Sequence, residues 1–160
     1  MKRSIIWLLP ALLIFSACSE KFEPKPLTYT QLLTGKEKKS WRATGIQIRE
    51  DNKPAGNFIL PENDCLFDDL YVFYANSERT FEVEDSSIKC APTDPDIIVS
   101  DNWAFSNANA TLEMYIPFLA PFKLPFVVRE LDEDQMVLEI WLDFENTDSY
   151  RISFEAIETN

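Results

Sequence analysis

The stretch MVLEIWLDFENTDSYRISFEAI, residues 136–157, decides the fold. Apolar side chains occupy alternate positions in both halves of it, and mostly charged or polar side chains lie between them. A period of two is typical of β-strands that have one buried and one wet face. The tetrad ENTD (145–148) separates the halves and resembles a turn. The stretch therefore predicts two antiparallel strands joined as a hairpin.

Further strands are expected before this hairpin. Segments rich in apolar and aromatic residues are separated by turn-like tetrads, and they cover residues 41–50, 57–60, 70–75, 80–85, 97–106, 111–117 and 126–131. Short linkers between successive strands imply antiparallel neighbours, so we expect the strands to run up and down. Such a set of strands forms either a sandwich or a closed barrel. The barrel is favoured because closure leaves no exposed strand edge.

One short helix is expected ahead of the first strand, in LTYTQLLTG (27–35). Thr28 or Thr30 can cap its start, and Gly35 is the residue type expected just past a helix end. The complete prediction is an all-β fold: an antiparallel up-and-down β-barrel of about eight to nine strands with one short N-terminal helix.

The N-terminal residues 1–17 have the layout of a signal peptide. Lys2 and Arg3 give a positive start, an apolar stretch follows at 5–15, and small residues precede Cys18. That apolar stretch is short for a membrane span. The pattern resembles a bacterial lipoprotein signal, which implies cleavage before Cys18 and lipid attachment to it. An ordinary cleaved signal, with Cys18 as a bystander, is the alternative.

The segment 18–27 is polar and contains two prolines, which predicts an extended tether between the lipid and a single domain at 28–160. The expected location is the outer membrane, where the protein is anchored by lipid on the periplasmic face or the cell surface. The membrane partner is then reached through Cys18.

The charge of the chain excludes some partners. The formal net charge is −12, and it becomes −14 once residues 1–17 leave, because they carry Lys2 and Arg3 and no acid. Nucleic acid requires a basic surface, so no nucleic-acid partner is expected. The same acidity argues against a basic patch for anionic lipid headgroups.

The remaining cysteines, Cys65 and Cys90, are expected to form a disulfide. An even pair outside the cytoplasm usually bridges, and no CxxC motif indicates a redox or metal site. Closing a loop of about 25 residues contributes roughly 3 kcal/mol in the chain-entropy estimate.

These features together resemble the lipocalin-like lipoproteins of Gram-negative envelopes. The resemblance runs along the mature chain through Cys18, the LLTG of the helix, Trp41 at the first strand, NDCLFDDLYVFYANSERTFEVED (63–85), Cys90, DNWAFS (101–106) and the closing hairpin. It implies an antiparallel barrel, a Cys65–Cys90 bridge, and a Trp41 that closes the barrel base by packing. The functions of such proteins are mostly unknown.

Little catalytic chemistry is available. The chain has no histidine, and bridged cysteines leave no thiol nucleophile. Glu113, Glu139 and Glu155 are expected on outward faces, where no cleft forms a carboxylate pair. We therefore expect no enzyme, no catalytic residue and no cofactor.

Acidic residues gather beside the two cysteines, at Asp64, Asp68, Asp69, Asp94 and Asp96. Their spacing matches no calcium loop, so solvated turn residues and no metal site are expected, with calcium kept as the alternative.

The run PFLAPFKLPF (117–126) is the most unusual stretch of this acidic chain. Its prolines exclude a helix and suit a crossing over a barrel end. Period two places Phe118, Phe122 and Phe126 in one phase, and with Trp103 they are the candidate ligand-binding residues. We predict that Phe118 and Phe122 point into the barrel mouth. The alternatives are a lid packed on its own core and a docking surface.

Two functions follow from this interpretation. In the first, the barrel mouth binds a small apolar or amphipathic ligand, as eight-stranded barrels can. In the second, the protein fills its barrel with its own side chains and docks an envelope protein or a glycan as an interaction or structural module.

Overall fold

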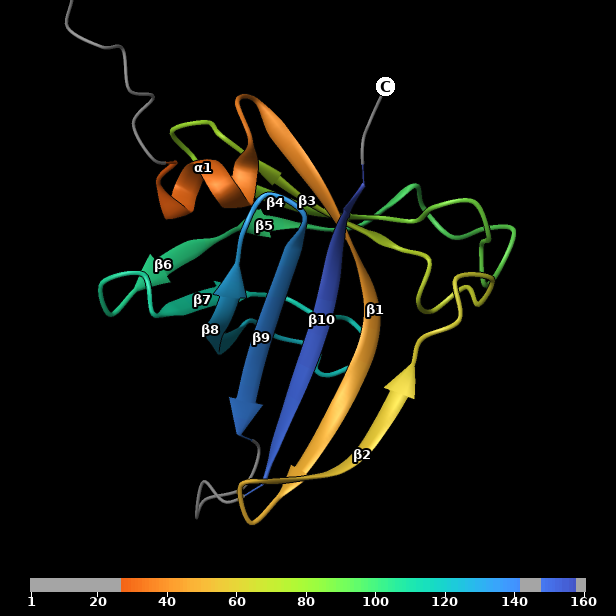
Figure 1. The fold of residues 1–160 in the computed structure, drawn as a ribbon. Coiled ribbons are helices and arrows are strands. Elements are labelled where there is room, and N and C mark those ends of the chain that lie inside the picture. The colour runs from red at the N-terminus through yellow and green to blue at the C-terminus, as the bar shows by residue number, and fades with distance from the viewer. Residues whose placement is uncertain (1–26, 142–147, 158–160) are drawn as a thin grey trace, which may run out of the picture.

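The computed structural model describes residues 27–141 and 148–157; the predicted signal peptide and Cys18 lie outside these ranges. The described elements are one helix and ten strands (Figure 1). They are α1 (Tyr29–Thr34), β1 (Lys38–Glu50), β2 (Lys53–Ile59), β3 (Leu70–Tyr74), β4 (Thr80–Glu84), β5 (Ile97–Asn102), β6 (Ala104–Ser106), β7 (Thr111–Met114), β8 (Leu124–Leu131), β9 (Gln135–Trp141) and β10 (Ser149–Ile157). Within this part of the chain, no helix combines the length and the apolar character that crossing a bilayer requires.

The strands form a nearly closed antiparallel barrel, which confirms the predicted fold class. The hydrogen-bonded order is β5-β4-β3-β1-β10-β9-β8-β7-β6, so the first strand pairs with the last. β2 pairs with β1 alone. The segment 97–106, predicted as one strand, is divided at Trp103 into β5, which pairs with β4, and β6, which pairs with β7. The chain thus passes from one edge of the sheet to the other at Trp103 and brings the edges together.

The closing hairpin consists of two antiparallel strands, β9 and β10, as predicted. Ile152 lies opposite Leu138 in β9, and on the other side it lies opposite Ile46 in β1. Leu138, Ile152 and Phe154 are buried. The alternation therefore places the apolar side chains of β9 and β10 in the barrel interior.

The helix α1 and Trp41 close one end of the barrel, which we call the base. The expected packing position of Trp41 agrees with this. Thr28 caps α1 through a capping box, and Gly35 ends it with φ of 63°, a backbone conformation that glycine adopts freely. Trp41 is fully buried, and its Nε1 donates a hydrogen bond to the backbone oxygen of Leu33 at 2.9 Å. Lys39 covers the Trp41 ring with Nζ 4.2 Å from the centroid. Helix, tryptophan and lysine together form the closed base.

The barrel interior is filled by side chains. Phe73 and Phe81 are in ring contact at 4.9 Å, and Tyr71 meets Phe154 edge-on at 5.4 Å. Trp103 completes this aromatic cluster beside Phe73 at 6.4 Å, and every one of these rings is at most 2% exposed. Such a core resembles a packed domain interior, and it places any ligand site outside the barrel's centre.

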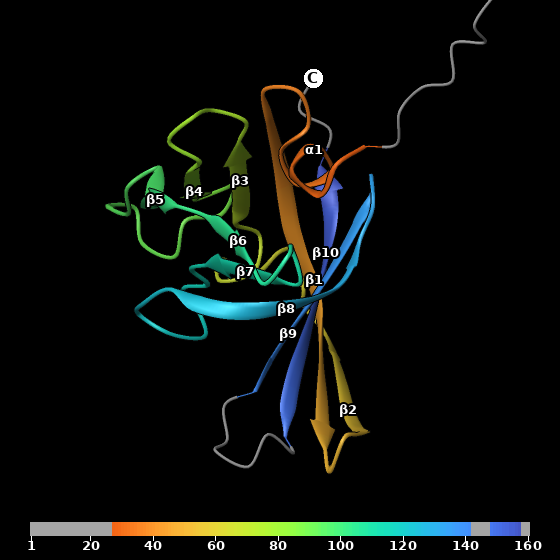
Figure 2. The same ribbon diagram turned by 90° about the vertical axis from the view of Figure 1, so that its left-hand side faces the viewer.

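One part of the sheet projects beyond the barrel. The hairpin of β1 and β2 and the adjoining ends of β9 and β10 extend past the shorter strands β6 and β7 (Figure 2). On β2, Phe58 is 56% exposed and Ile59 is 90% exposed. Large apolar side chains on an edge strand are unusual on a soluble surface.

Candidate ligand site at the barrel mouth

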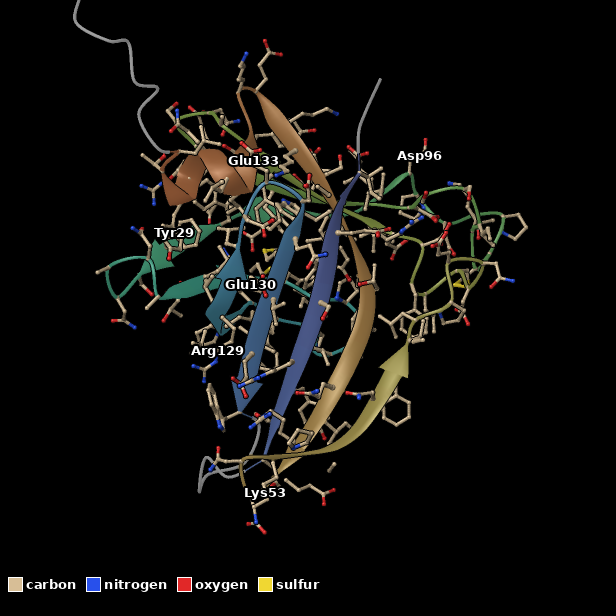
Figure 3. The ribbon with its side chains drawn as sticks, in the orientation of Figure 1. Tyr29, Lys53, Asp96, Arg129, Glu130 and Glu133 are labelled. Carbon is tan, nitrogen blue, oxygen red and sulfur yellow. A yellow bond between two sulfur atoms is a disulfide. The ribbon has the colours of Figure 1, made fainter. Side chains whose placement is uncertain are left out.

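Three loops form the end of the barrel opposite α1, which we call the mouth. They are residues 60–69 before β3, 85–96 after β4 and 115–123 between β7 and β8. Figure 1 shows the first two loops on the side of the molecule away from the helix, and Figure 3 labels Tyr29 on α1 and Asp96 in the second loop at opposite sides. The mouth is therefore built from the stretches that carry the cysteines and the proline-phenylalanine run.

A disulfide joins two of these loops. Cys65 and Cys90 are bonded, with their Cα atoms 5.0 Å apart, as predicted. Asp68 adds a second link, because its Oδ2 accepts hydrogen bonds from the backbone N–H groups of Ser87 and Ile88, both at 3.0 Å. The loops before β3 and after β4 are thus held together by one covalent bond and one charge-assisted cluster.

The mouth contains a cavity of about 310 Å³ beside the disulfide. Its lining consists of Cys65, Leu66, Asp69, Asp85, Cys90, Asp94, Pro95, Ile98, Pro117 and Phe118. The volume lies at the lower end of the range for small-molecule sites, roughly 300–1,000 Å³. Apolar walls with a few polar groups are also typical of such sites.

The apolar wall depends on Phe118. Its ring meets that of Phe67 edge-on, with the centroids 5.5 Å apart, and it packs against the core. Leu66 and Ile98 complete the wall and are 54% and 40% exposed. Half-exposed aliphatic side chains around an opening are available to cover a ligand.

The floor of the cavity carries two buried carboxyl groups. Asp69 is 5% exposed, and Asp85 has a side chain that is 3% exposed. Burial, followed by repulsion from Asp85 and Asp68, raises the pKa of Asp69 from 3.8 to about 7. Asp85 has Lys89 Nζ at 3.9 Å. For Asp69 Oδ1, no hydrogen-bond partner occurs among the described residues.

The predicted ligand-binding residues occupy different places. Phe118 lines the mouth cavity, in agreement with the predicted orientation. Phe122 is 60% exposed, so the prediction that it points into the mouth is wrong. Residues 115–123, which include Pro121, form no strand between β7 and β8, and period two does not persist through an irregular crossing. Phe126 and Trp103 lie in the closed core, where they pack and do not border the cavity.

Lys123, the one charge in the proline-phenylalanine run, has a structural place. Its Nζ lies 3.1 Å from Asp101 Oδ1 and 2.6 Å from the backbone oxygen of Asn102. These contacts join the crossing loop to the end of β5, next to the point where the barrel is only nearly closed.

A buried carboxylate away from the mouth, Glu139, lies on the outer face of β9. It was expected on a wet face, and that expectation is wrong, because Glu139 is 1% exposed. Ser149 Oγ donates to its Oε1 at 2.6 Å, Arg151 Nε lies 3.1 Å from its Oε2, and Arg49 Nε lies 3.7 Å from its Oε1. Arg129, labelled in Figure 3, also donates to it. Burial raises the pKa of Glu139, but these donors offset it and leave the pKa below its usual value.

A further hollow, of about 520 Å³, lies at the closed base beside α1 and is lined by residues that include Leu27, Lys36 and Glu133. Although it is larger, none of its lining side chains has a buried polar atom without a partner. The mouth cavity is therefore the better candidate site.

The calcium alternative finds no support in the described residues. Across residues 27–141 and 148–157, no group of at least three His, Cys, Asp or Glu side chains is placed to hold a metal ion. Asp68 uses one oxygen to join two loops, and Asp94 accepts a hydrogen bond from the backbone N–H of Ala91 at 2.6 Å. These acidic residues are neither all solvated, as expected, nor gathered around one point.

No family model matches the sequence, and no curated protein matches it. The resemblance to lipocalin-like envelope lipoproteins is therefore still a prediction, while the β-barrel and its disulfide are structural findings.

Proposed function

We propose that the protein is a lipid-anchored, non-enzymatic binding module of the bacterial envelope that takes a small apolar or amphipathic molecule at the barrel mouth. The observation that carries this proposal is the apolar-walled cavity beside the disulfide, next to a barrel interior that is already filled. A preformed opening lowers the ordering cost of binding, and here two linked loops hold it in shape.

Binding without catalysis agrees with the side chains available. The chain has no histidine, and the disulfide uses both cysteines at the cavity. The acidic groups that line the cavity, Asp69, Asp85 and Asp94, have neither a histidine nor, in the described part of the chain, a free thiol beside them to act as base or nucleophile.

The proposed anchor suits the position of the mouth. The polar tether leads from Cys18 to α1, which lies at the closed end of the barrel. Lipid on Cys18 would hold the base toward an outer-membrane leaflet and leave the mouth facing away from the bilayer. The resemblance to lipocalin-like envelope lipoproteins supports the same location.

The test uses a neutral apolar probe and a matched pair of phenylalanines. N-phenyl-1-naphthylamine fluoresces in apolar surroundings, so its titration into the purified full chain at about pH 7.5 reports an apolar site. We expect saturable binding that is weakened by Phe118→Ala and unchanged by Phe122→Ala, since only Phe118 lines the cavity. Absence of binding, or equal loss in both variants, would overturn the proposal.

A second function rests on the projecting hairpin. β2 pairs with β1 on one edge and leaves its other edge free. Its side chains Ile59 and Phe58 are large, apolar and exposed. A free edge can accept an added strand from a protein partner. A photo-crosslinking residue in place of Ile59 should then give one discrete adduct in native envelopes, whereas the same residue in place of Glu130 should give none. Identical adduct patterns at both positions would count against docking.

A further inference from the structure

The floor of the mouth cavity differs from the acidic surface around it, because its central carboxyl group is buried and unsatisfied. Asp69 lines the cavity and is 5% exposed, and its Oδ1 has no hydrogen-bond partner in the part of the chain that the structure describes. A buried polar atom without a partner is costly, and native proteins seldom retain one without a compensating role. Asp69 is therefore the group to which a ligand would be matched.

All the charged side chains that line the cavity around Asp69 are acidic. Asp85 and Asp94 also line it, and the lining contains no basic residue. Lys89 Nζ lies 3.9 Å from Asp85, but it is engaged by Asp96 Oδ1 and by the backbone oxygen of Asp94, both at 2.7 Å. The field in the cavity favours a cation and repels an anion.

The rest of the lining is apolar. Phe118 and Ile98 form one side, and Leu66 lies beside the disulfide. The cavity thus combines acidic side chains with an apolar wall. This combination fits a molecule that has a cationic head group and an apolar body.

We propose that the occupant of the mouth cavity is a small amphipathic amine, whose ammonium group donates a charge-assisted hydrogen bond to Asp69 Oδ1 while its apolar body packs against Phe118. The proposal rests on the binding function given above and adds the sign of the ligand's charge. An ammonium supplies the missing donor and neutralises part of the acidic floor. A neutral apolar molecule would leave Asp69 unsatisfied.

The titration of Asp69 gives the binding a direction in pH. Its pKa is raised to about 7 by burial and by Asp85 and Asp68, and Tyr71, whose own pKa is raised by burial and by Asp69, lies beneath it. Asp94 faces the same cavity, and Lys89 lies beyond Asp85. An ammonium favours ionised Asp69, so its affinity should increase between about pH 6 and pH 8, where the carboxyl group loses its proton.

The experiment compares three probes with the same eight-carbon chain: n-octylamine, n-octanol and octanoate. Each is titrated calorimetrically into the purified full chain at about pH 7.5. We expect octylamine to bind about tenfold or more tightly than octanol, and octanoate to bind most weakly. Asp69→Asn should remove the preference for the amine and retain octanol binding. Glu130→Gln, which removes an exposed acid that does not line the cavity, should leave all three affinities unchanged.

The outcomes separate this inference from the function on which it rests. Equal affinity for amine and alcohol, or tightest binding of octanoate, would overturn the amine and leave the apolar site standing. Failure of all three probes to bind would overturn the proposed function itself. If circular dichroism shows that Asp69→Asn does not fold, Asp85→Asn serves as the second variant. It should lower the preference for the amine over the alcohol. An unchanged preference would contradict the claim that the acidic side chains of the cavity select the amine.

Discussion

Two carboxyl groups buried on the same barrel have opposite surroundings. Glu139, on the outer face of β9, receives a hydrogen bond from Ser149 and is surrounded by three arginines, and its pKa is lowered. Asp69, at the mouth, has an oxygen without a partner among the described residues and two acidic neighbours, and its pKa is raised to about 7. Both oxygens of Glu139 therefore have donors within the protein, whereas Asp69 Oδ1 has none in the described part of the chain.

This difference separates a structural charge from a functional one. A buried carboxylate that is surrounded by donors holds strands together, because removing it would leave cations unpaired. A buried carboxyl group without donors lowers stability, and proteins tend to keep such groups where a ligand needs them. The same substitution, acid to amide, should therefore act in opposite directions at Glu139 and Asp69.

The largest effect is expected from Glu139→Gln. The amide cannot balance the arginines, so the free energy of unfolding should fall by about 3–5 kcal/mol at neutral pH. Urea denaturation measures this change, and Glu130→Gln on the neighbouring strand should alter stability by less than about 0.5 kcal/mol. Because the pKa of Glu139 is lowered in the folded state, its contribution is present above its unfolded pKa of about 4.5 and is lost as the pH falls through the lower folded value. A loss below about 1 kcal/mol would show that the arginines are solvated well enough without it.

The next effect concerns the mouth alone. Replacing both Cys65 and Cys90 with serine should lower the free energy of unfolding by roughly 3 kcal/mol, since the bridge closes a loop of 25 residues. It should also loosen the floor, so that the pKa of Asp69 moves from about 7 toward 3.8. NMR titration of the Asp69 carboxyl carbon measures the shift. An unchanged pKa would mean that the disulfide has no part in burying Asp69.

A smaller effect of opposite sign is expected from Asp69→Asn. The raised pKa means that the folded state retains the Asp69 proton while the unfolded chain loses it, so the stability contribution of this group falls as the pH increases from about 4 to 7 and is constant above. The amide cannot ionise, so it should stabilise the protein by about 1–3 kcal/mol at pH 8 and by less than about 0.5 kcal/mol at pH 4. Thermal denaturation at both pH values measures this. If Asp69→Asn instead lowers the stability at pH 8, the Asp69 carboxylate stabilises the fold, as that of Glu139 is expected to do.

The smallest effects are expected in the proline-phenylalanine run. Phe118→Ala removes a ring that contacts Phe67 and should lower the free energy of unfolding by about 1–3 kcal/mol. Phe122→Ala removes an exposed ring and should change it by less than about 0.5 kcal/mol. Chemical denaturation of the two variants side by side tests whether only the Phe118 ring packs at the cavity; equal losses would show that the Phe122 ring is packed as well.

The sequence predicted the barrel better than the site, for physical reasons that particular residues illustrate. Period two identified the inner faces of β9 and β10 correctly, because alternation depends on local geometry alone. It also placed Glu139 on the outer face, but its burial depends on long side chains that reach it from β1, β8 and β10. No pattern within β9 contains that information.

Asp69 illustrates the same limit at the mouth. The cysteine pairing indicated that acids near Cys65 and Cys90 approach each other, and Asp69 and Asp94 do line one cavity. Neighbouring Asp68 and Asp69 look equivalent in sequence, yet one receives backbone hydrogen bonds from the loop after β4 and the other receives none in the described structure. The loop conformation decides which of the two aspartates receives hydrogen bonds, and strand periodicity does not determine loop conformation.

The pairing of β1 with β10 has a consequence for how the chain folds. β1 lies in the middle of the strand order, with β10 on one side and β3 and the small strand β2 on the other, so the first and the last strand join the two halves of the sheet. This pairing cannot form until β10 is available, and contacts between residues far apart in sequence form slowly. The disulfide, by contrast, lies within one continuous segment and needs no part of β10. We therefore expect the mouth loops to be joined early and the pairing of β1 with β10 to be the final, rate-limiting event.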